Sequence, residues 1–391
     1  MTPSRDLSWL ERTGDRVFSR EELERKLSSG RPLRIKYGVD VTAPFLHIGH
    51  AVNLWMMRRL QEQGPRVQFL IGDFTTRIGD PTGRSAARAV PARAQIEANA
   101  AEFIRQVGRV LLTDPAVFEV RRNSEWYDAM SVDQFLALVG MVTHSRLVQR
   151  DMFQRRIQNG DEIYMHEMLY PVLQGYDSRM LESDMTIVGS DQLFNELMGR
   201  TYQEKLGREP QVVITTRITP GTDGVAKQSK SLGNYIALAD SPRDMFGKAM
   251  SIPDHLTTLY LEVYTEVPMS EVAGLGEPYA AKKRLAAELV RRYHGEEAAA
   301  AETSYWEETI AARRTPDHLP EVDPSRHASL LDLIQACVPG RTRSEIRRLA
   351  SEGGIALDDQ RVDAGALVAA ARAGSVLRVG KRHWFRLVAR S

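Results

Sequence analysis

The stretch Lys36-Tyr-Gly-Val-Asp-Val-Thr-Ala-Pro-Phe-Leu-His-Ile-Gly-His50 predicts a short buried strand, a tight turn and the start of a helix. Two histidines and a glycine stand where that helix is expected to begin. A helix N-terminus carries unpaired N–H groups and a partial positive charge, so it is suited to a phosphate group. The stretch therefore predicts a phosphate-binding turn directly after a core strand.

The segments around this turn predict a parallel sheet. Residues 33–40 and 67–73 read as strands, and between them apolar residues recur at helical spacing until Gly64-Pro65. A strand, a helix and a strand form a βαβ unit, which indicates a Rossmann-like half. Further strands are expected within 184–192 and 211–218. Residues 1–31 and 92–160 are predicted to be mainly helical, with an interruption around Arg121–Trp126.

Several later segments carry polar side chains that suit a binding site. The loop 72–85 is rich in turn formers and follows a strand, where ligands bind in open α/β sheets. Tyr170, Gln174 and Asp177 have the spacing i, i+4, i+7 and share one face of a predicted helix. That face is either a pocket wall or the polar side of a surface helix. The segment 227–234, with two lysines and a glycine, is expected to form a mobile surface loop.

Composition indicates a globular chain of two or three domains. The 391 residues include 42% hydrophobic and 26% charged residues, with a net charge of +1. Cys337 stands alone, so an internal disulfide is excluded. An apolar run of about 18 residues is missing, and the N-terminal residues lack the apolar core of a signal peptide. A cytoplasmic protein without a membrane span is therefore expected.

We expect three parts: a catalytic domain over residues 1–235, a helical domain and linker over 236–325, and a small module over 326–391. Residues 341–391 contain 11 Lys and Arg against 5 Asp and Glu, which favours a tail that faces nucleic acid. Within that tail, Thr342-Arg-Ser-Glu345 is a capping box that predicts the start of a helix.

The two histidines and two lysines together suggest chemistry on ATP. His47 and His50 can donate hydrogen bonds to phosphate oxygens, and Lys227 and Lys230 can neutralise a leaving pyrophosphate. Attack of a carboxylate on the α-phosphate needs mainly positioning and positive charge, which a loop closing over the phosphates supplies. Mg²⁺ is expected to accompany ATP, and no dedicated metal site is predicted from the sequence.

The ordered set of motifs resembles the bacterial tyrosyl-tRNA synthetases, a class I aminoacyl-tRNA synthetase family, over nearly the whole chain. The matching residues include Leu46-His-x-Gly-His50, Gly72-Asp-Phe-Thr75, Asn123-Ser-Glu-Trp126, Gln174-Gly-Tyr-Asp-Ser178, Gly189-Ser-Asp-Gln192 and Lys227-x-Ser-Lys-Ser231. The resemblance implies an α/β fold with a Rossmann-like catalytic domain, a helical domain and a small α+β RNA-binding module. It also implies tyrosine–tRNA ligase activity in a homodimer, with L-tyrosine, ATP and tRNA(Tyr) as substrates.

Site roles are carried over by position from this resemblance. Catalytic roles fall to His47, His50, Lys227 and Lys230. ATP contacts fall to Asp40, Thr42, Gly49, Gly189, Asp191 and Lys230. Tyrosine contacts fall to Asp80, Tyr170, Gln174, Asp177 and Gln192, with Asp177 accepting the substrate hydroxyl. Contacts to tRNA fall to Arg343, Arg347, Arg348, Lys381 and Arg382.

Some positions depart from the family pattern. Lys36 stands where some relatives have a tyrosine that touches the substrate hydroxyl, and Gln228 replaces the methionine of the lysine loop. Other departures are Val41, Phe45, Val188 and Thr216-Arg217. They leave room for a paralogue that activates a tyrosine analogue. Two further alternatives are a tryptophanyl-tRNA synthetase, which shares the Gly-x-Asp-Gln segment, and an RNA-binding paralogue that does not charge tRNA.

Overall fold

The computed structural model describes residues 7–42, 46–80, 91–229, 232–311, 319–380 and 383–389. The chain divides into two compact units. Unit 1 comprises Met1–Ala239 and Ile252–Pro278, and unit 2 comprises Asp240–Ser251 and Tyr279–Ser391. The expected division into three parts stays a prediction.

Unit 1 is built on a six-stranded sheet with the order β1-β6-β5-β2-β3-β4. The strands are β1 (Gly14–Phe18), β2 (Arg34–Val39), β3 (Arg66–Ile71), β4 (Phe118–Arg122), β5 (Met185–Gly189) and β6 (Val212–Thr216). Strand β1 is antiparallel to β6, and the other neighbours are parallel. The central strands are apolar because both of their faces are covered. The predicted Rossmann-like parallel sheet is confirmed.

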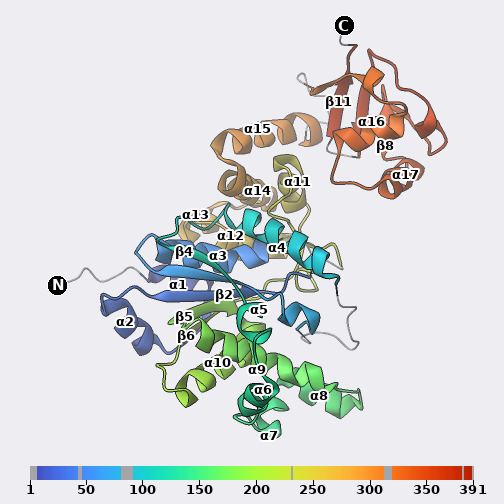
Figure 1. Ribbon diagram of the computed structural model, residues 1–391. Helices are drawn as coiled ribbons and strands as arrows, with labels where there is room; N and C mark the ends of the chain where they lie inside the picture. Colours follow the sequence, from blue (N-terminus) through green and yellow to red (C-terminus); the bar gives the residue numbers. More distant parts are fainter. Residues whose placement is uncertain are drawn as a thin grey trace. The chain divides into compact units, whose positions relative to one another are not determined.

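Helices cover both faces of this sheet. In Figure 1, α3 (Ile48–Gln61) and α4 (Arg93–Val107) lie on one side, and α9 (Met165–Met180) and α10 (Leu193–Lys205) lie on the other. The remaining α-helices of unit 1 are α1 (Ser8–Thr13), α2 (Arg20–Ser28), α5 (Ser124–Tyr127), α6 (Val132–Val139), α7 (His144–Leu147), α8 (Asp151–Asn159), α12 (Thr257–Tyr264) and α13 (Met269–Gly274).

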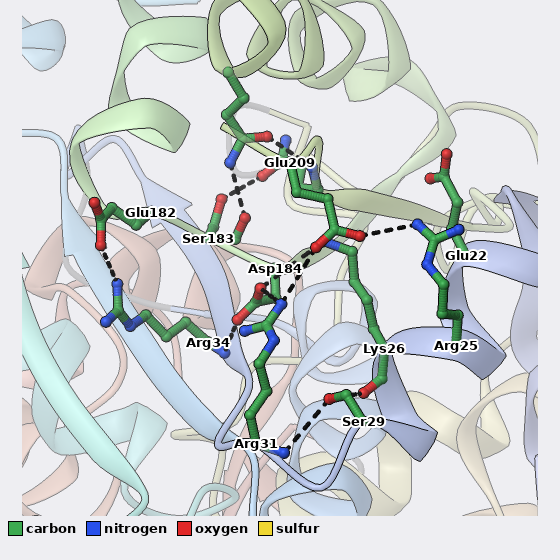
Figure 2. Close-up of polar contacts among 12 residues, drawn as sticks. Glu22, Arg25, Lys26, Ser29, Arg31, Arg34, Glu182, Ser183, Asp184 and Glu209 are labelled. Carbon is green, nitrogen blue, oxygen red and sulfur yellow. Dashed lines mark hydrogen bonds and ion pairs between the residues drawn. The ribbon is translucent and has the colours of Figure 1, made fainter. Parts of the chain in front are cut away.

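A cluster of opposite charges ties α2 to the amino-terminal ends of β2 and β5 (Figure 2). The buried Lys26 Nζ lies 3.8 Å from Asp184 Oδ1 and 3.5 Å from Glu209 Oε2. Asp184 Oδ2 also accepts the backbone N–H of Arg34 at 2.9 Å, and Arg31 pairs with the other carboxylate oxygen. Burial lowers the pKa of Lys26, and the two carboxylates oppose that shift. The charged form of this buried side chain is therefore stabilised by Asp184 and Glu209.

Unit 2 combines helices with a small sheet. Its helices are α11 (Pro242–Met250), α14 (Pro278–His294), α15 (Glu296–Trp306), α16 (Leu330–Cys337) and α17 (Arg343–Ser351). Its strands are β7 (Glu321–Val322), β8 (Ile355–Leu357), β9 (Gln360–Arg361), β10 (Val376–Val379) and β11 (His383–Leu387), in the order β7-β11-β10-β8-β9. Apolar side chains of α16, α17 and the strands form one core. The capping box at Thr342 and Glu345 is present as predicted.

Two strands of unit 1 lie where mainly helical sequence was predicted. Strand β1 lies within residues 1–31, and β4 lies within 92–160, where it overlaps the interruption predicted around Arg121–Trp126. Each of them is an edge strand of the sheet, so neither shows a long apolar run or a clean alternation. In the part of the chain that the structure describes, no helix combines the length and apolar character needed to cross a bilayer.

Candidate active site

A cavity of about 470 Å³ opens at the carboxyl-terminal ends of the parallel strands of unit 1. The ends of β2 and β5 contribute Val39 and Gly189 to its wall. Ligands bind at this edge in open α/β sheets because the loops that follow the strands converge there. The predicted ATP and tyrosine residues that line it are Asp40, Thr42, His47, Gly49, His50, Asp80, Tyr170, Gln174, Asp177, Gly189, Asp191, Gln192 and Lys227.

The N-terminus of α3 forms one wall of the cavity. His47 is the N-cap residue, and its backbone N–H donates to Nδ1 of His50 at 3.3 Å. In a neutral His50 ring the proton therefore lies on Nε2, which makes that atom the donor. A Cβ atom at Gly49 would lie 3.0 Å from the His47 ring, so a larger residue would displace the imidazole. This arrangement suits an anionic group at the helix end.

Asp40 connects the end of β2 with the opposite wall. Its carboxylate accepts from Thr75 Oγ1 at 2.9 Å and from the hydroxyl of Tyr170 at 3.0 Å. Burial raises the pKa of Asp40 to about 6, and the two donors oppose that rise. Gly72 is required beside it, because a Cβ atom there would lie 2.7 Å from Asp40 Oδ1.

Asp177 lies deep in the cavity with donors on both carboxylate oxygens. The indole N–H of Trp126 donates to Oδ1 at 3.0 Å, and Nδ2 of Asn123 lies 3.4 Å from Oδ2. Burial raises the pKa of Asp177 to about 7, whereas the nearby Lys36 ammonium lowers it. A buried carboxylate with this pKa can accept a hydrogen bond from a hydroxyl group of a ligand near neutral pH.

Amide and carboxylate side chains form a third wall. Gln192 Nε2 donates to Asp80 Oδ2 at 2.7 Å, and Arg150 pairs with Asp80 Oδ1 at 3.1 Å. Gln174 Nε2 donates to Glu196 Oε1 at 2.8 Å. These acceptor-rich groups suit a cationic ligand group.

An ion pair that the sequence did not predict also belongs to the lining of the cavity. Lys36 Nζ is 2.8 Å from Glu196 Oε2, and both side chains are about 2% exposed. Lys36 also donates to Ser178 Oγ at 2.8 Å. At the position where some relatives carry a tyrosine, this chain therefore places a buried ammonium that is paired with a carboxylate.

The lysine loop begins at the rim of the cavity. Lys227 Nζ lies 3.2 Å from Asp191 Oδ2, so two predicted site residues contact each other. Gln228 Nε2 donates to the hydroxyl of Tyr264 at 2.6 Å. Asn234 holds the loop by donating to the carbonyl oxygens of Ala226 and Lys227 and by accepting the backbone N–H of Ser229.

The predicted tRNA contacts that the structure describes do not line this cavity. Arg343, Arg347 and Arg348 lie on α17 in unit 2, and all three are exposed. Lys230, Lys381, Arg382 and Phe45 lie outside the described residues. Among the side chains that the structure describes, no three His, Cys, Asp or Glu residues gather as a metal-binding group.

Sequence reasoning missed four groups that bear on the site. Glu196 and Asn195 follow Gln192 on the next helical turn, so the spacing i, i+3, i+4 could have indicated them. Trp126 belongs to the motif Asn123-Ser-Glu-Trp126, but the motif alone assigns no role to its indole N–H. Arg150 is 70 residues from Asp80 in the chain, and nothing in its local sequence indicates their contact.

Comparisons with known proteins agree with this geometry. The family described as "tRNA synthetases class I (W and Y)" matches residues 28–310. The chain is 41% identical over 398 residues to the tyrosine–tRNA ligase of Moorella thermoacetica, across 98% of this chain and 96% of that protein. It is also 41% identical to the tyrosine–tRNA ligase of Oleidesulfovibrio alaskensis, across 100% of both chains. A C-terminally truncated mitochondrial tyrosyl-tRNA synthetase of Aspergillus nidulans matches with a TM-score of 0.62 and 25% identity, over 76% of this chain and 91% of that one.

Proposed function

The chain belongs to the class I tRNA synthetases of the tryptophan and tyrosine group, and from this premise we infer that it is a tyrosine–tRNA ligase. One observation carries the inference. A single cavity joins a helix N-terminus suited to phosphate with a deep carboxylate suited to a hydroxyl group and an acceptor-rich wall suited to an ammonium group. L-Tyrosine and ATP together present these three groups.

The first reaction forms tyrosyl-adenylate. A carboxylate oxygen of tyrosine attacks the α-phosphorus of ATP, the bond to the β-phosphate breaks, and pyrophosphate leaves. His47 and His50 face the phosphates, and Lys227 and Lys230 neutralise the charge that develops on pyrophosphate. These groups act by position and charge in the transition state rather than by covalent chemistry.

The amino acid is held at the other end of the cavity. We assign the substrate hydroxyl to Asp177 and the ammonium group to Asp80, Tyr170, Gln174 and Gln192. Asp40, Thr42, Gly49, Gly189 and Asp191 are assigned to ATP. Mg²⁺ fits this proposal as an ion that travels with the phosphates, because Mg²⁺ is commonly held by substrate phosphates and few carboxylates.

In the second reaction the terminal ribose hydroxyl of tRNA attacks the activated carbonyl carbon, and AMP leaves. The exposed arginines of α17 support RNA binding by this part of the chain, because guanidinium groups pair with phosphates. We assign Arg343, Arg347, Arg348, Lys381 and Arg382 to this contact.

A homodimer is also part of the proposal. Helices α6, α7, α8 and α9 share one apolar cluster, to which they contribute Leu138, Leu147, Phe153 and Met168. The same helices leave Val132, Leu136 and Met165 between 61% and 73% exposed, which is typical of a surface that meets another protein. Sedimentation of the wild-type chain should give a mass of two chains. The double variant with Leu136→Asp and Met165→Asp should sediment with the mass of one chain. A monomeric wild-type chain at micromolar concentration would overturn the proposed homodimer.

The activation step is tested by exchange of labelled pyrophosphate into ATP. We expect exchange that depends on L-tyrosine and is weaker with tryptophan or phenylalanine. Lys230→Ala should lower the exchange rate by about tenfold to a thousandfold, since it removes a charge that acts in the transition state. A preference for tryptophan would select the other branch of the family, and no exchange with any amino acid would reject the activity.

A further inference from the structure

Asn195 occupies an unusual position behind the acceptor-rich wall. It lies on α10 and is fully buried. Its Nδ2 donates to Oε1 of Gln174 at 2.7 Å and to Oε1 of Gln192 at 3.1 Å. One amide nitrogen therefore binds the carbonyl oxygens of both glutamines that line the cavity.

The amino groups of the two glutamines are directed to carboxylates instead. Gln174 Nε2 donates to Glu196, and Gln192 Nε2 donates to Asp80. Each of these carboxylates also pairs with a cation, Glu196 with Lys36 and Asp80 with Arg150, and a carboxylate oxygen in such a pair accepts hydrogen bonds. The two ion pairs thus fix the polarity of the network from its ends, and Asn195 joins its halves.

This arrangement leaves one buried polar atom without a hydrogen bond, which is energetically unfavourable. Within the described residues, Oδ1 of Asn195 is buried without a hydrogen-bond partner. A buried unsatisfied acceptor is rare and calls for an explanation. Rotation of the Asn195 amide would place that oxygen against two other carbonyl oxygens, which is worse, so the orientation is determined by the glutamines.

We propose that Asn195 is a positioning residue that holds the carboxamides of Gln174 and Gln192 with their oxygens available to the ammonium group of the substrate. Each amide oxygen has two lone pairs, of which Asn195 uses one and leaves one for the ligand. A flipped carboxamide would present N–H groups to the ammonium and repel it. This inference rests on the proposed function and adds to it a residue that does not itself touch the substrate.

The test separates the ammonium group from the rest of the substrate. Asn195→Asp keeps the shape but cannot donate, and Asn195→Ser keeps one small donor. Binding of L-tyrosine and of 3-(4-hydroxyphenyl)propanoate, which lacks the amino group, is measured by calorimetry on the full-length chain. We expect Asn195→Asp to weaken tyrosine about tenfold to a hundredfold, Asn195→Ser to weaken it less, and both to change the deaminated acid by less than about twofold.

The matched control is Gln61→Ala. Gln61 is also a buried carboxamide of unit 1, and it bonds backbone groups of Leu112 and Val117. The Gln61→Ala variant should have a lower melting temperature and unchanged affinities for L-tyrosine and for the deaminated acid. Equal loss of tyrosine and of the deaminated acid in the Asn195 variants, or no loss of either, would overturn the proposal. A wild-type chain that binds tyrosine but catalyses no exchange would reject the proposed activity while the test of Asn195 still stands.

Discussion

The side chain of Asp177 links the electrostatics of the cavity to substrate choice. Its carboxylate is buried at the wall of the cavity, and this burial raises its pKa from 3.8 to about 7. Above about pH 7 the group is ionised and accepts strongly from a phenol hydroxyl. Below that pH it is protonated and accepts more weakly, so discrimination between tyrosine and phenylalanine should depend on pH.

We predict that the KM for tyrosine in pyrophosphate exchange rises as the pH falls from about 8 to 6, while the KM for phenylalanine stays nearly constant. Asp177→Asn should remove the part of the profile that is centred near 7. Asp40, whose pKa is raised to about 6, should still titrate in that variant. A pH profile that is unchanged by Asp177→Asn would contradict the assignment of the hydroxyl to this residue.

The raised pKa of Asp177 also makes the stability of the folded chain depend on pH. Because the pKa of Asp177 is higher in the folded chain than its ordinary 3.8, the folded state binds more protons between about pH 4 and 7. The contribution of Asp177 to the free energy of unfolding therefore falls as the pH rises through this range. The site gains an ionised acceptor near neutral pH at a cost in stability.

At this residue scale, the sequence could predict the residue types of the cavity but not all of their partners. Tyr170, Gln174 and Asp177 were predicted as one helix face, and all three line the cavity. The Lys36–Glu196 ion pair was not predicted, because it joins a strand to a helix about 160 residues later. Periodicity within one element contains no information about such a contact.

At the scale of elements, the charged cluster of α2, β2 and β5 concerns stability rather than chemistry. It lies at the amino-terminal ends of β2 and β5, whereas the cavity lies at their carboxyl-terminal ends. Asp184, directly before β5, is one of two carboxylates near the buried Lys26, and it also accepts the backbone N–H of Arg34. Asp184→Ala would remove both of these contacts. We predict a loss of about 3–5 kcal/mol in the free energy of unfolding by urea.

Arg20→Ala is the control for this experiment. Arg20 forms an exposed pair with Glu24 on the same helix, at 3.4 Å. Such surface pairs contribute about 0.5 kcal/mol or less. Similar losses for Asp184→Ala and Arg20→Ala would show that the cluster does not stabilise unit 1.

The basic face of α17 is the element expected to contact RNA. Arg347→Gln together with Arg348→Gln should weaken tRNA binding and reduce the slope of log affinity against log salt by roughly one to two. Arg326→Gln removes an exposed arginine of the same unit outside this helix and should change the slope little. Filter binding between 50 and 200 mM salt measures all three chains. An unchanged slope in the α17 variant would place the RNA contact elsewhere.

The central strands of the sheet were predicted from the sequence, whereas the edge strands were not, because the two kinds of strand differ in burial. Strands β2, β3, β5 and β6 were predicted because burial on both faces makes them apolar runs. Strands β1 and β4 lie at the two edges of the sheet, and their exposed positions interrupt the pattern. The capping box of α17 was predicted because side-chain caps are local in sequence.

At the scale of the whole molecule, the residues that we assign to the small substrates and to tRNA belong to different units. The cavity and its predicted small-molecule contacts belong to unit 1, and the described arginines assigned to tRNA belong to unit 2. Each unit has its own core, so the chemistry of activation and the binding of RNA can be impaired independently. Variants of α17 should therefore lower tRNA charging while leaving tyrosine-dependent pyrophosphate exchange nearly unchanged.

The central claim is that the full-length chain joins tyrosine to tRNA. The most direct measurement is transfer of labelled L-tyrosine to a bulk tRNA preparation in the presence of ATP and Mg²⁺, with labelled tryptophan in a parallel reaction. We predict acid-precipitable, alkali-labile tyrosine on tRNA, and with tryptophan no more than background. Exchange without any transfer to tRNA, or preferential transfer of tryptophan, would contradict the account.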